Sequence, residues 1–292
     1  MQGASSGRWY RGLAVVVTPL LVVFVGVLLV LPWIERKMIY FPDTRLYRTP
    51  TEAGIGFEDV QFAAADGTRL HGWFVPARSA EVANGRALLL SHGNAGNIAD
   101  RVEWIAMLHR GLDAHILAYD YRGFGRSEGE PSEEGLYADA DAALATLRAR
   151  EAVDPAKICV IGRSLGGGVT AELAVRAIDA GAPPAAVVLE STFTSMGALA
   201  GILFPAVPGL GRLIRTGYDN LGKVPRIRAA GVPIVVVHGG VDELIPVAMG
   251  HTLATAAGVA PVIIERGGHN DAWYVGGEQR YLPPLRAVLS EL

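Results

Sequence analysis

Three short stretches of this sequence are apolar at every position, and they constrain the fold more than any other feature. They are residues 87–90, 158–161 and 234–237, and each is followed by a glycine-containing loop and then by a helix-like segment. A strand that helices cover on both faces is continuously apolar, because neither of its faces meets water. The sequence therefore predicts a sheet buried between two layers of helices.

Five further runs rich in β-forming residues join these three. The Asp66-Gly67 pair separates the first two runs and favours a hairpin turn. Strand–helix alternation over about 230 residues predicts an α/β fold with a doubly wound, mostly parallel sheet of eight strands and helices on both faces. The expected strands are 59–63, 70–75, 87–91, 114–120, 157–161, 185–189, 233–238 and 262–265, and the expected helices are 98–110, 132–150, 165–180, 247–257 and 278–292.

The N-terminal part differs from the rest of the chain. No charged residue lies between Gly12 and Ile34, and the run 13–31 is almost wholly apolar. Nineteen helical residues at about 1.5 Å each span roughly 28 Å, close to the thickness of a hydrocarbon core. We expect a single-pass membrane anchor. A cleavable signal peptide is the alternative, but it would have a shorter apolar region and a small-x-small cleavage site. Basic residues flank both ends, so the side of the membrane stays open.

Charge and cysteine content exclude several classes of protein. The formal net charge is −3, which provides no basic excess to neutralise nucleic-acid phosphates. The single cysteine, Cys159, excludes an internal disulfide and a cysteine-based zinc site. Its position inside an expected core strand favours a small buried hydrophobic residue over a catalytic thiol.

The motif Gly-x-Ser-x-Gly occurs twice, with Ser127 and Ser164 at the two centres. Such a motif indicates a nucleophile when a strand ends just before it and a helix begins at it, because the sharp turn exposes the hydroxyl group. Ser164 follows the expected strand 157–161 and precedes the expected helix 165–180. The motif around Ser127 runs into Gly-Glu-Pro at 129–131, which indicates a loop. We interpret Ser164 as the nucleophile and Ser127 as a residue of a surface loop.

An acid and a histidine are expected after the serine in the chain order of such a site. His238 ends an apolar strand and favours a structural role, and His251 lies mid-helix and favours solvent. His269 lies in a glycine-rich loop after the last strand, from which its ring can reach the serine. Asp242, in the loop after the preceding strand, is the expected acid, and its neighbour Glu243 is the less favoured candidate.

A serine nucleophile also needs N–H groups that stabilise an oxyanion. The backbone N–H of Leu165, at the start of the expected helix, is one expected donor. Asn94, in the glycine-containing loop 91–97, is expected to supply the other. A phosphate-binding loop is the alternative interpretation of 91–97, but the stretch lacks the Gly-Lys-Ser/Thr ending.

Four runs together resemble the α/β-hydrolase-fold serine hydrolases. The resemblance covers about 55–290 and is closest to a membrane-anchored branch, whose relatives include palmitoyl-protein thioesterases and lysophospholipase-like or serine aminopeptidase-like enzymes. It implies the α/β-hydrolase fold, a triad of Ser164, Asp242 and His269, and no metal or organic cofactor. The four runs are Ser-His-Gly-Asn-Ala-Gly-Asn at 91–97, Tyr-Asp-Tyr-Arg-Gly-Phe-Gly at 119–125, Gly-Arg-Ser-Leu-Gly-Gly at 162–167 and His-Gly-Gly-Val-Asp-Glu-Leu-Ile-Pro at 238–246.

The chain is thus expected to have three parts: a tail and transmembrane anchor over 1–35, a connecting segment over 36–54, and a catalytic domain over 55–292 with a short apolar lid at about 192–224. The expected function is that of a membrane-anchored serine hydrolase, which cleaves carboxylic esters or thioesters of acyl chains through an acyl-enzyme. Its expected partners are a small or lipid-like acyl substrate and a lipid bilayer. A peptidase of the same fold, or a non-catalytic binding or scaffold protein on that fold, is the alternative, and the oligomeric state stays open.

Overall fold

The structure, a computed structural model, describes residues 18, 30, 33–207 and 209–292. The chain divides into two units, Met1–Tyr40 and Phe41–Leu292. In the first unit, residues 33–39 are helical. The strands found among the described residues all belong to the second unit.

The expected anchor over 13–31 lies, except for Thr18 and Val30, outside the described residues. Among the residues that the structure does describe, no helix combines the length and the apolarity needed to cross a membrane. The single-pass anchor therefore gains no support from the structure and stays a prediction.

Strands and helices alternate along most of the second unit. Each of the eight expected strands is present within two residues of its expected bounds, and so are the expected helices 132–150, 165–180 and 247–257. The strands are β1 (Phe41–Pro42), β2 (Glu58–Ala63), β3 (Arg69–Val75), β4 (Ala87–Ser91), β5 (Ala95–Gly96), β6 (His115–Asp120), β7 (Ile158–Arg163), β8 (Ala186–Glu190), β9 (Ile234–Gly239) and β10 (Val262–Ile264). The α-helices are α2 (Ala80–Ala83), α3 (Val102–Leu112), α4 (Glu133–Arg148), α5 (Leu165–Asp179), α6 (Met196–Leu203), α7 (Leu210–Leu213), α8 (Asn220–Ala229), α9 (Val247–Ala257), α10 (Ala272–Arg280) and α11 (Leu282–Ser290), and the 3₁₀ helices are η1 (Pro50–Ala53), η2 (Ile98–Arg101) and η3 (Pro155–Lys157).

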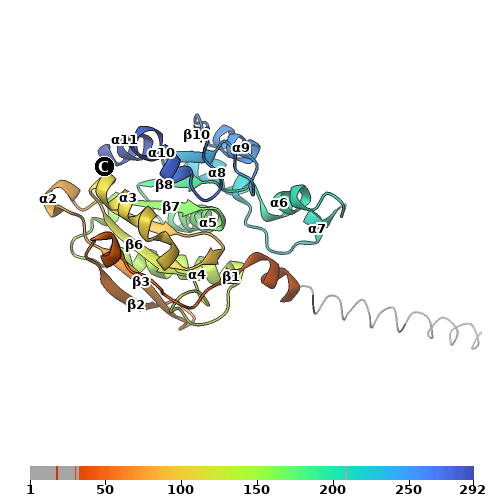
Figure 1. The fold of residues 1–292 in the computed structure, drawn as a ribbon, viewed down its shortest axis with the longest axis horizontal. Coiled ribbons are helices and arrows are strands. Elements are labelled where there is room, and N and C mark those ends of the chain that lie inside the picture. The colour runs from red at the N-terminus through yellow and green to blue at the C-terminus, as the bar shows by residue number, and fades with distance from the viewer. Residues whose placement is uncertain (1–17, 19–29, 31–32, 208) are drawn as a thin grey trace, which may run out of the picture. The chain divides into compact units, whose positions relative to one another are not determined.

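The central sheet has eight strands in the order β10-β9-β8-β7-β4-β6-β3-β2 (Figure 1). The strands from β10 to β6 in this order pair in parallel, whereas β3 pairs antiparallel with both β2 and β6. The sheet is therefore mixed, which corrects the expectation of a mostly parallel sheet. The cause lies at Asp66-Gly67, where Gly67 has φ 84° and the chain turns back to run β3 against β2. The two short strands β1 and β5 form a separate parallel pair.

Helices cover both faces of the sheet (Figure 1). α3, α10 and α11 pack together on one face, and α4, α5, α8 and α9 form a continuous row on the other.

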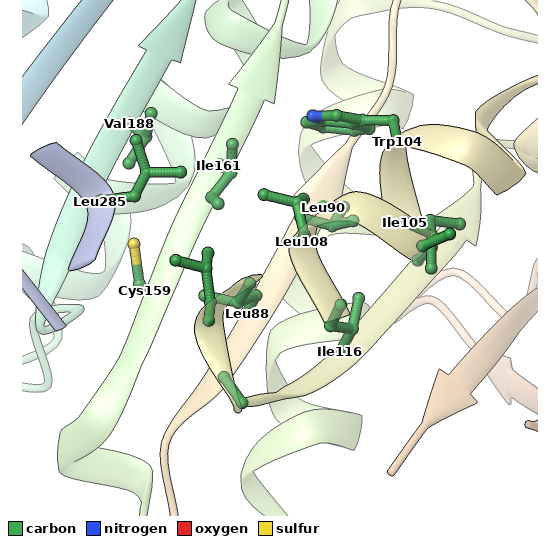
Figure 2. Close-up of a cluster of buried hydrophobic side chains, with 14 of the residues drawn as sticks. Leu88, Leu90, Trp104, Ile105, Leu108, Ile116, Cys159, Ile161, Val188 and Leu285 are labelled. Atoms are coloured by element: carbon green, nitrogen blue, oxygen red, sulfur yellow. The ribbon is translucent and has the colours of Figure 1, made fainter. Parts of the chain in front are cut away.

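β4 shows why the expected strands are continuously apolar. Leu88 and Leu90 pack in a cluster with α3 and α11, in which Cys159 and Leu285 also lie (Figure 2). Leu89, which points to the opposite face, is fully buried as well.

The parallel strands β4, β7, β9 and β10 end at the same edge of the sheet, because parallel strands share a direction. The loops that follow them carry Asn94, Ser164, Asp242 and His269, respectively. In an open α/β sheet, ligands bind at the carboxyl ends of the strands. The fold thus brings the four loops of the expected site to one edge.

Candidate active site

Ser164 forms the turn between β7 and α5. β7 ends at Arg163 and α5 begins at Leu165, so the serine alone joins the strand to the helix. Its backbone angles, φ 55° and ψ −120°, lie where residues with a side chain are rarely found. Such a conformation costs about 1–3 kcal/mol and persists only where the surroundings hold it. Here the Ser164 amide donates to the carbonyl oxygen of Glu190 at 2.9 Å, and Thr192 Oγ1 donates to the Ser164 carbonyl at 2.7 Å.

The two glycines of the motif allow this turn to close. A Cβ atom on Gly162 would lie 2.2 Å from the carbonyl oxygen of Gly166. A Cβ atom on Gly166 would lie 2.0 Å from the carbonyl oxygen of Ser91, in β4. Both distances are far below the contact distance of carbon and oxygen. Both oxygens belong to the backbone, so they cannot move aside as the end of a side chain could. Glycine is therefore required at these positions by close backbone approach.

His269 lies between Ser164 and Asp242. The Oγ of Ser164 is 2.9 Å from Nε2 of His269, and Nδ1 of the same ring is 2.9 Å and 3.1 Å from the two carboxylate oxygens of Asp242. A carboxylate accepts hydrogen bonds only, so Nδ1 carries the proton and Nε2 is left to accept from the serine hydroxyl. The structure thus brings the three expected residues together in a tautomer that suits proton transfer from Ser164.

The carboxyl group of Asp242 is fully buried. Burial alone raises the pKa of a carboxyl group, but hydrogen bonds from His269 and from the amides of Ile245 and Leu244 outweigh it. The pKa of Asp242 is therefore lowered from its ordinary value, and the group is a carboxylate at neutral pH. The neighbouring His238 donates from Nε2 to the carbonyl oxygen of Ile245 at 2.9 Å. Its burial lowers its pKa, which agrees with the structural role expected for it.

The loop after β4 lies beside Ser164. A Cβ atom on Gly93 would be 3.5 Å from Cβ of Ser164, so the backbone at Gly93 faces the serine directly. Asn94 follows it, and its carbonyl oxygen accepts a hydrogen bond of 2.9 Å from the amide of Phe41, where β1 begins to pair with β5. On the other side of the serine, Leu165 is the first residue of α5. The two residues expected to form an oxyanion hole therefore belong to the two segments next to Ser164.

Two residues that sequence reasoning did not assign to the site hold the backbone of His269. Arg163 Nη2 donates to the His269 carbonyl oxygen at 3.0 Å, and the His269 amide donates to Oε2 of Glu243 at 3.1 Å. Glu243 is thus a hydrogen-bond acceptor for the loop and not the acid that faces the ring. Only their positions in the sequence could have indicated that these two residues belong to the site, since Arg163 precedes Ser164 and Glu243 follows Asp242.

The second serine motif lies in a surface loop, as expected. Its neighbours Arg126 and Glu128 are exposed, whereas the side chain of Ser127 itself is buried. Its hydroxyl group accepts from the amide of His71 at 2.9 Å and donates to the carbonyl oxygen of Asp120 at 2.7 Å. Ser127 therefore bridges β3 and β6 and is not followed by a helix.

The remaining candidates have ordinary structural roles. His251 is exposed on α9, as expected. Complete burial raises the pKa of the Cys159 thiol to about 12, so this cysteine is protonated at neutral pH and is no nucleophile. Within residues 18, 30, 33–207 and 209–292, no group of His, Cys, Asp and Glu side chains could hold a metal ion.

Comparison with known proteins finds relatives of the alpha/beta hydrolase family. Residues 86–217 match the family model of the alpha/beta hydrolase fold. The chain is 37% identical over 259 residues to the uncharacterized protein Rv2307c of Mycobacterium tuberculosis, with 88% of each chain covered. It is 32% identical over 279 residues to the alpha/beta hydrolase domain-containing protein WAV2 of Arabidopsis thaliana, again over 88% of each.

Solved structures show the same fold. The esterase Pf2001 of Pyrococcus furiosus matches with a TM-score of 0.67 at 19% identity, over 87% of this chain and 97% of that one. An alpha-beta hydrolase of Vibrio vulnificus matches with a TM-score of 0.64 at 23% identity, over 82% of each chain. At these identities the similarity concerns the architecture, and it leaves the choice of substrate to the site itself.

Proposed function

The chain belongs to the α/β-hydrolase family, and from this premise we propose that it is a serine hydrolase that cleaves carboxylic esters or thioesters. The observation that carries the proposal is the hydrogen-bonded series from Ser164 Oγ through both ring nitrogens of His269 to Asp242. A serine hydroxyl is a weak nucleophile unless an oriented base accepts its proton. This series supplies the base and orients it.

In the proposed reaction, Ser164 Oγ attacks the acyl carbon while its proton passes to Nε2 of His269. The tetrahedral intermediate collapses, and the leaving alcohol or thiol takes the proton from the imidazolium. An acyl ester remains on Ser164. Water then attacks this ester by the same route, which releases the carboxylic acid and restores the serine. Asp242 accepts from Nδ1–H throughout, which keeps the tautomer and stabilises the imidazolium.

The negative charge on the tetrahedral intermediate needs donors that are already in place. We assign this role to the backbone N–H groups of Leu165 and Asn94. The location of Leu165 at the N-terminus of α5 supports the assignment, because first-turn N–H groups have no partner within a helix and the helix dipole favours an anion. The close approach of Gly93 to Ser164 supports the assignment of its neighbour Asn94.

The decisive experiment is labelling with a fluorophosphonate probe, which reacts with activated serines. We expect the full-length protein to be labelled, and we expect Ser164→Ala to lose labelling and to lower the turnover of a p-nitrophenyl ester by about 10⁴–10⁶. Ser127→Ala is the matched control and retains labelling, since its hydroxyl is buried between two strands. Absence of labelling in a well-folded wild type would favour a non-catalytic protein on this fold.

The preference for acyl chains is supported by the segment that follows β8. α6, α7 and the turn between them carry an apolar lid surface, which consists of the exposed side chains Ile202, Leu203, Phe204, Val207 and Leu213. Residues 191–218 contain no Asp or Glu, whereas Arg212 and Arg215 are exposed. Apolar side chains bordered by arginine complement acyl chains and anionic lipid headgroups. We infer that the lid surface meets a lipid bilayer and admits acyl chains from it.

The membrane anchor over 13–31 belongs to the same proposal, and its support is the length and apolarity of that run. Extraction of cell membranes with alkaline carbonate tests it. We expect the full chain to stay in the membrane pellet and a chain that lacks residues 1–35 to be released. Release of the full chain would contradict an anchor that spans the bilayer.

A further inference from the structure

A pair of buried charged residues lies directly behind the nucleophile. Arg163 and Glu190 are register partners at the ends of the adjacent parallel strands β7 and β8. They are 4% and 0% exposed, so water provides no solvation for either. Nε of Arg163 is 3.6 Å from Oε1 of Glu190. A buried pair of this kind is costly to form, so its presence is weak evidence for a contribution to stability.

The carboxyl group of Glu190 is held from its far side by two aromatic residues. The hydroxyl group of Tyr281 donates to Oε2 of Glu190 at 2.5 Å, and Nε1 of Trp104 donates to the Tyr281 hydroxyl at 3.0 Å. Both aromatic side chains are buried and belong to the layer of α3, α10 and α11. Glu190 therefore has a fixed orientation, and it holds the guanidinium group of Arg163 in turn.

The opposite end of Arg163 points to the histidine loop. Its Nη2 donates to the carbonyl oxygen of His269 at 3.0 Å and to Oδ1 of Asn270 at 3.2 Å. The His269 amide donates to Glu243 on its other side. The peptide groups before and after the His269 Cα atom are thus both fixed by side chains. They add to the hydrogen bonds of the two preceding glycines, since the Gly267 amide donates to the Ile264 carbonyl oxygen at 2.8 Å and the Gly268 amide donates to Oδ1 of Asp271 at 2.7 Å.

We propose that Arg163 is a positioning residue for His269, which it fixes through the backbone so that Nε2 stays 2.9 Å from Ser164 Oγ. This inference rests on the proposed function, because it assigns Arg163 a part in the proton transfer of that same site. The residue between the first glycine and the serine of the motif thereby connects the two loops of the site. A misplacement of about 1 Å between reacting groups can lower a rate by about 100-fold.

A purely structural role makes a different prediction. If Arg163 served only to neutralise Glu190, removal of both charges would restore stability and activity together, because no unpaired buried charge would remain. If Arg163 positions His269, removal of both charges restores stability but leaves the histidine loop without its donor. The activity of a double variant that lacks both charges therefore distinguishes the positioning role from the structural role.

The experiment compares the full-length wild type with Arg163→Met, Glu190→Gln and the double variant. Its readouts are the thermal midpoint, kcat and KM on p-nitrophenyl butyrate, and the rate of labelling by a fluorophosphonate probe. We expect Arg163→Met to lower kcat and the labelling rate by about 100-fold with KM within about threefold. We expect the double variant to regain the thermal midpoint while kcat stays low. Arg286→Met is the matched control, because Arg286, like Arg163, donates to a carbonyl oxygen and forms an ion pair with a glutamate, but at the exposed surface of α11.

A wild-type kcat in Arg163→Met would overturn the inference, and so would kcat and thermal midpoint restored together in the double variant. If Arg163→Met does not fold, the variant Arg163→Lys distinguishes the positioning role from the structural role. Lysine keeps the charge opposite Glu190 but loses the planar fork that reaches His269 and Asn270. We therefore expect a folded enzyme with kcat about tenfold lower, and an unchanged kcat refutes the proposal.

If the wild type itself is not labelled, the proposed function fails. If wild type and Arg163→Met are labelled equally fast, only the positioning role fails.

Discussion

At Asp242, burial and hydrogen bonding act in opposite directions on one carboxyl group. Burial raises its pKa, and the hydrogen bonds from His269, Ile245 and Leu244 lower it by more. Because the pKa is lower in the folded chain, the carboxylate stabilises the fold at any pH above the ordinary aspartate pKa of about 3.9. That stabilisation is lost as the pH falls through the folded-state pKa.

Asp242→Asn therefore has two expected effects. Turnover falls by about 10⁴, because an amide cannot accept from Nδ1–H and from two backbone amides as a carboxylate does. The difference in the free energy of unfolding between wild type and variant is greatest above about pH 5 and shrinks as the pH falls below the ordinary aspartate pKa. Urea titrations between pH 3 and pH 7, with turnover measured at pH 7, check both effects.

Asp219→Asn is the control for this substitution. Asp219 is exposed and accepts from the Gly222 amide at the start of α8, and asparagine caps a helix as well as aspartate does. Its turnover should match that of the wild type. A difference between wild type and Asp242→Asn that stays constant from pH 3 to pH 7 would refute the assignment of a lowered pKa to Asp242.

At the scale of elements, the antiparallel edge of the sheet depends on a serine from a neighbouring loop. His71 and Asp120 are register partners of β3 and β6, and the Ser127 hydroxyl lies between the amide of one and the carbonyl oxygen of the other. The hydroxyl thereby satisfies two buried backbone groups where the strand pairing ends. Removal of such a partner leaves both groups unsatisfied.

Ser127→Ala is therefore expected to lower the free energy of unfolding by about 1–3 kcal/mol and to leave kcat within about twofold. Chemical denaturation and turnover of the same preparation measure the two effects. Ser290→Ala is the control: Ser290 also donates to a backbone carbonyl but is exposed on α11, so its stability should be unchanged. Equal stability of the two variants would show that the Ser127 bridge contributes nothing.

Elements with a regular apolar pattern could be predicted from the sequence, and elements made by local geometry could not. The apolar runs of β4, β7 and β9 were recognisable because they are buried on both faces. β1 and β5 have two residues each, too few to show any periodicity. The single helix expected over 278–292 is the last turn of α10 followed by α11, and the kink at Gly277, with φ 39° and ψ −136°, lies inside α10.

In the site, too, residues placed by a local sequence pattern could be predicted, and residues placed by long-range contacts could not. Ser164, Asp242 and His269 could be predicted because each lies in a loop after a strand, and the chain order of such residues is restricted. Arg163 and Glu243 could not be predicted, because their role depends on where side chains reach across the molecule. Arg163 contacts a loop 106 residues further along the chain. No spacing in the sequence records such a contact.

At the scale of the whole molecule, the apolar lid surface on α6, α7 and the turn between them is proposed to meet lipid and to receive acyl chains. Leu203 and Phe204 are 48% and 43% exposed, and Arg212 and Arg215 of the same segment are exposed as well. Each methylene group of an acyl chain gains about 0.8 kcal/mol on leaving water. Loss of the apolar contact should therefore affect long acyl chains and leave short ones almost unchanged.

The double substitution Leu203→Ser and Phe204→Ser tests this contact. We expect kcat/KM for p-nitrophenyl palmitate, presented in anionic vesicles, to fall about three- to tenfold, and kcat/KM for p-nitrophenyl butyrate in solution to stay within about twofold. Val82→Ser is the control, because Val82 is an exposed apolar residue on α2 and its loss should change neither value. If the double variant hydrolyses both esters at wild-type rates, the lid surface does not receive acyl chains. If both rates fall by the same factor, the two side chains support the site as a whole, and the acyl preference must originate elsewhere.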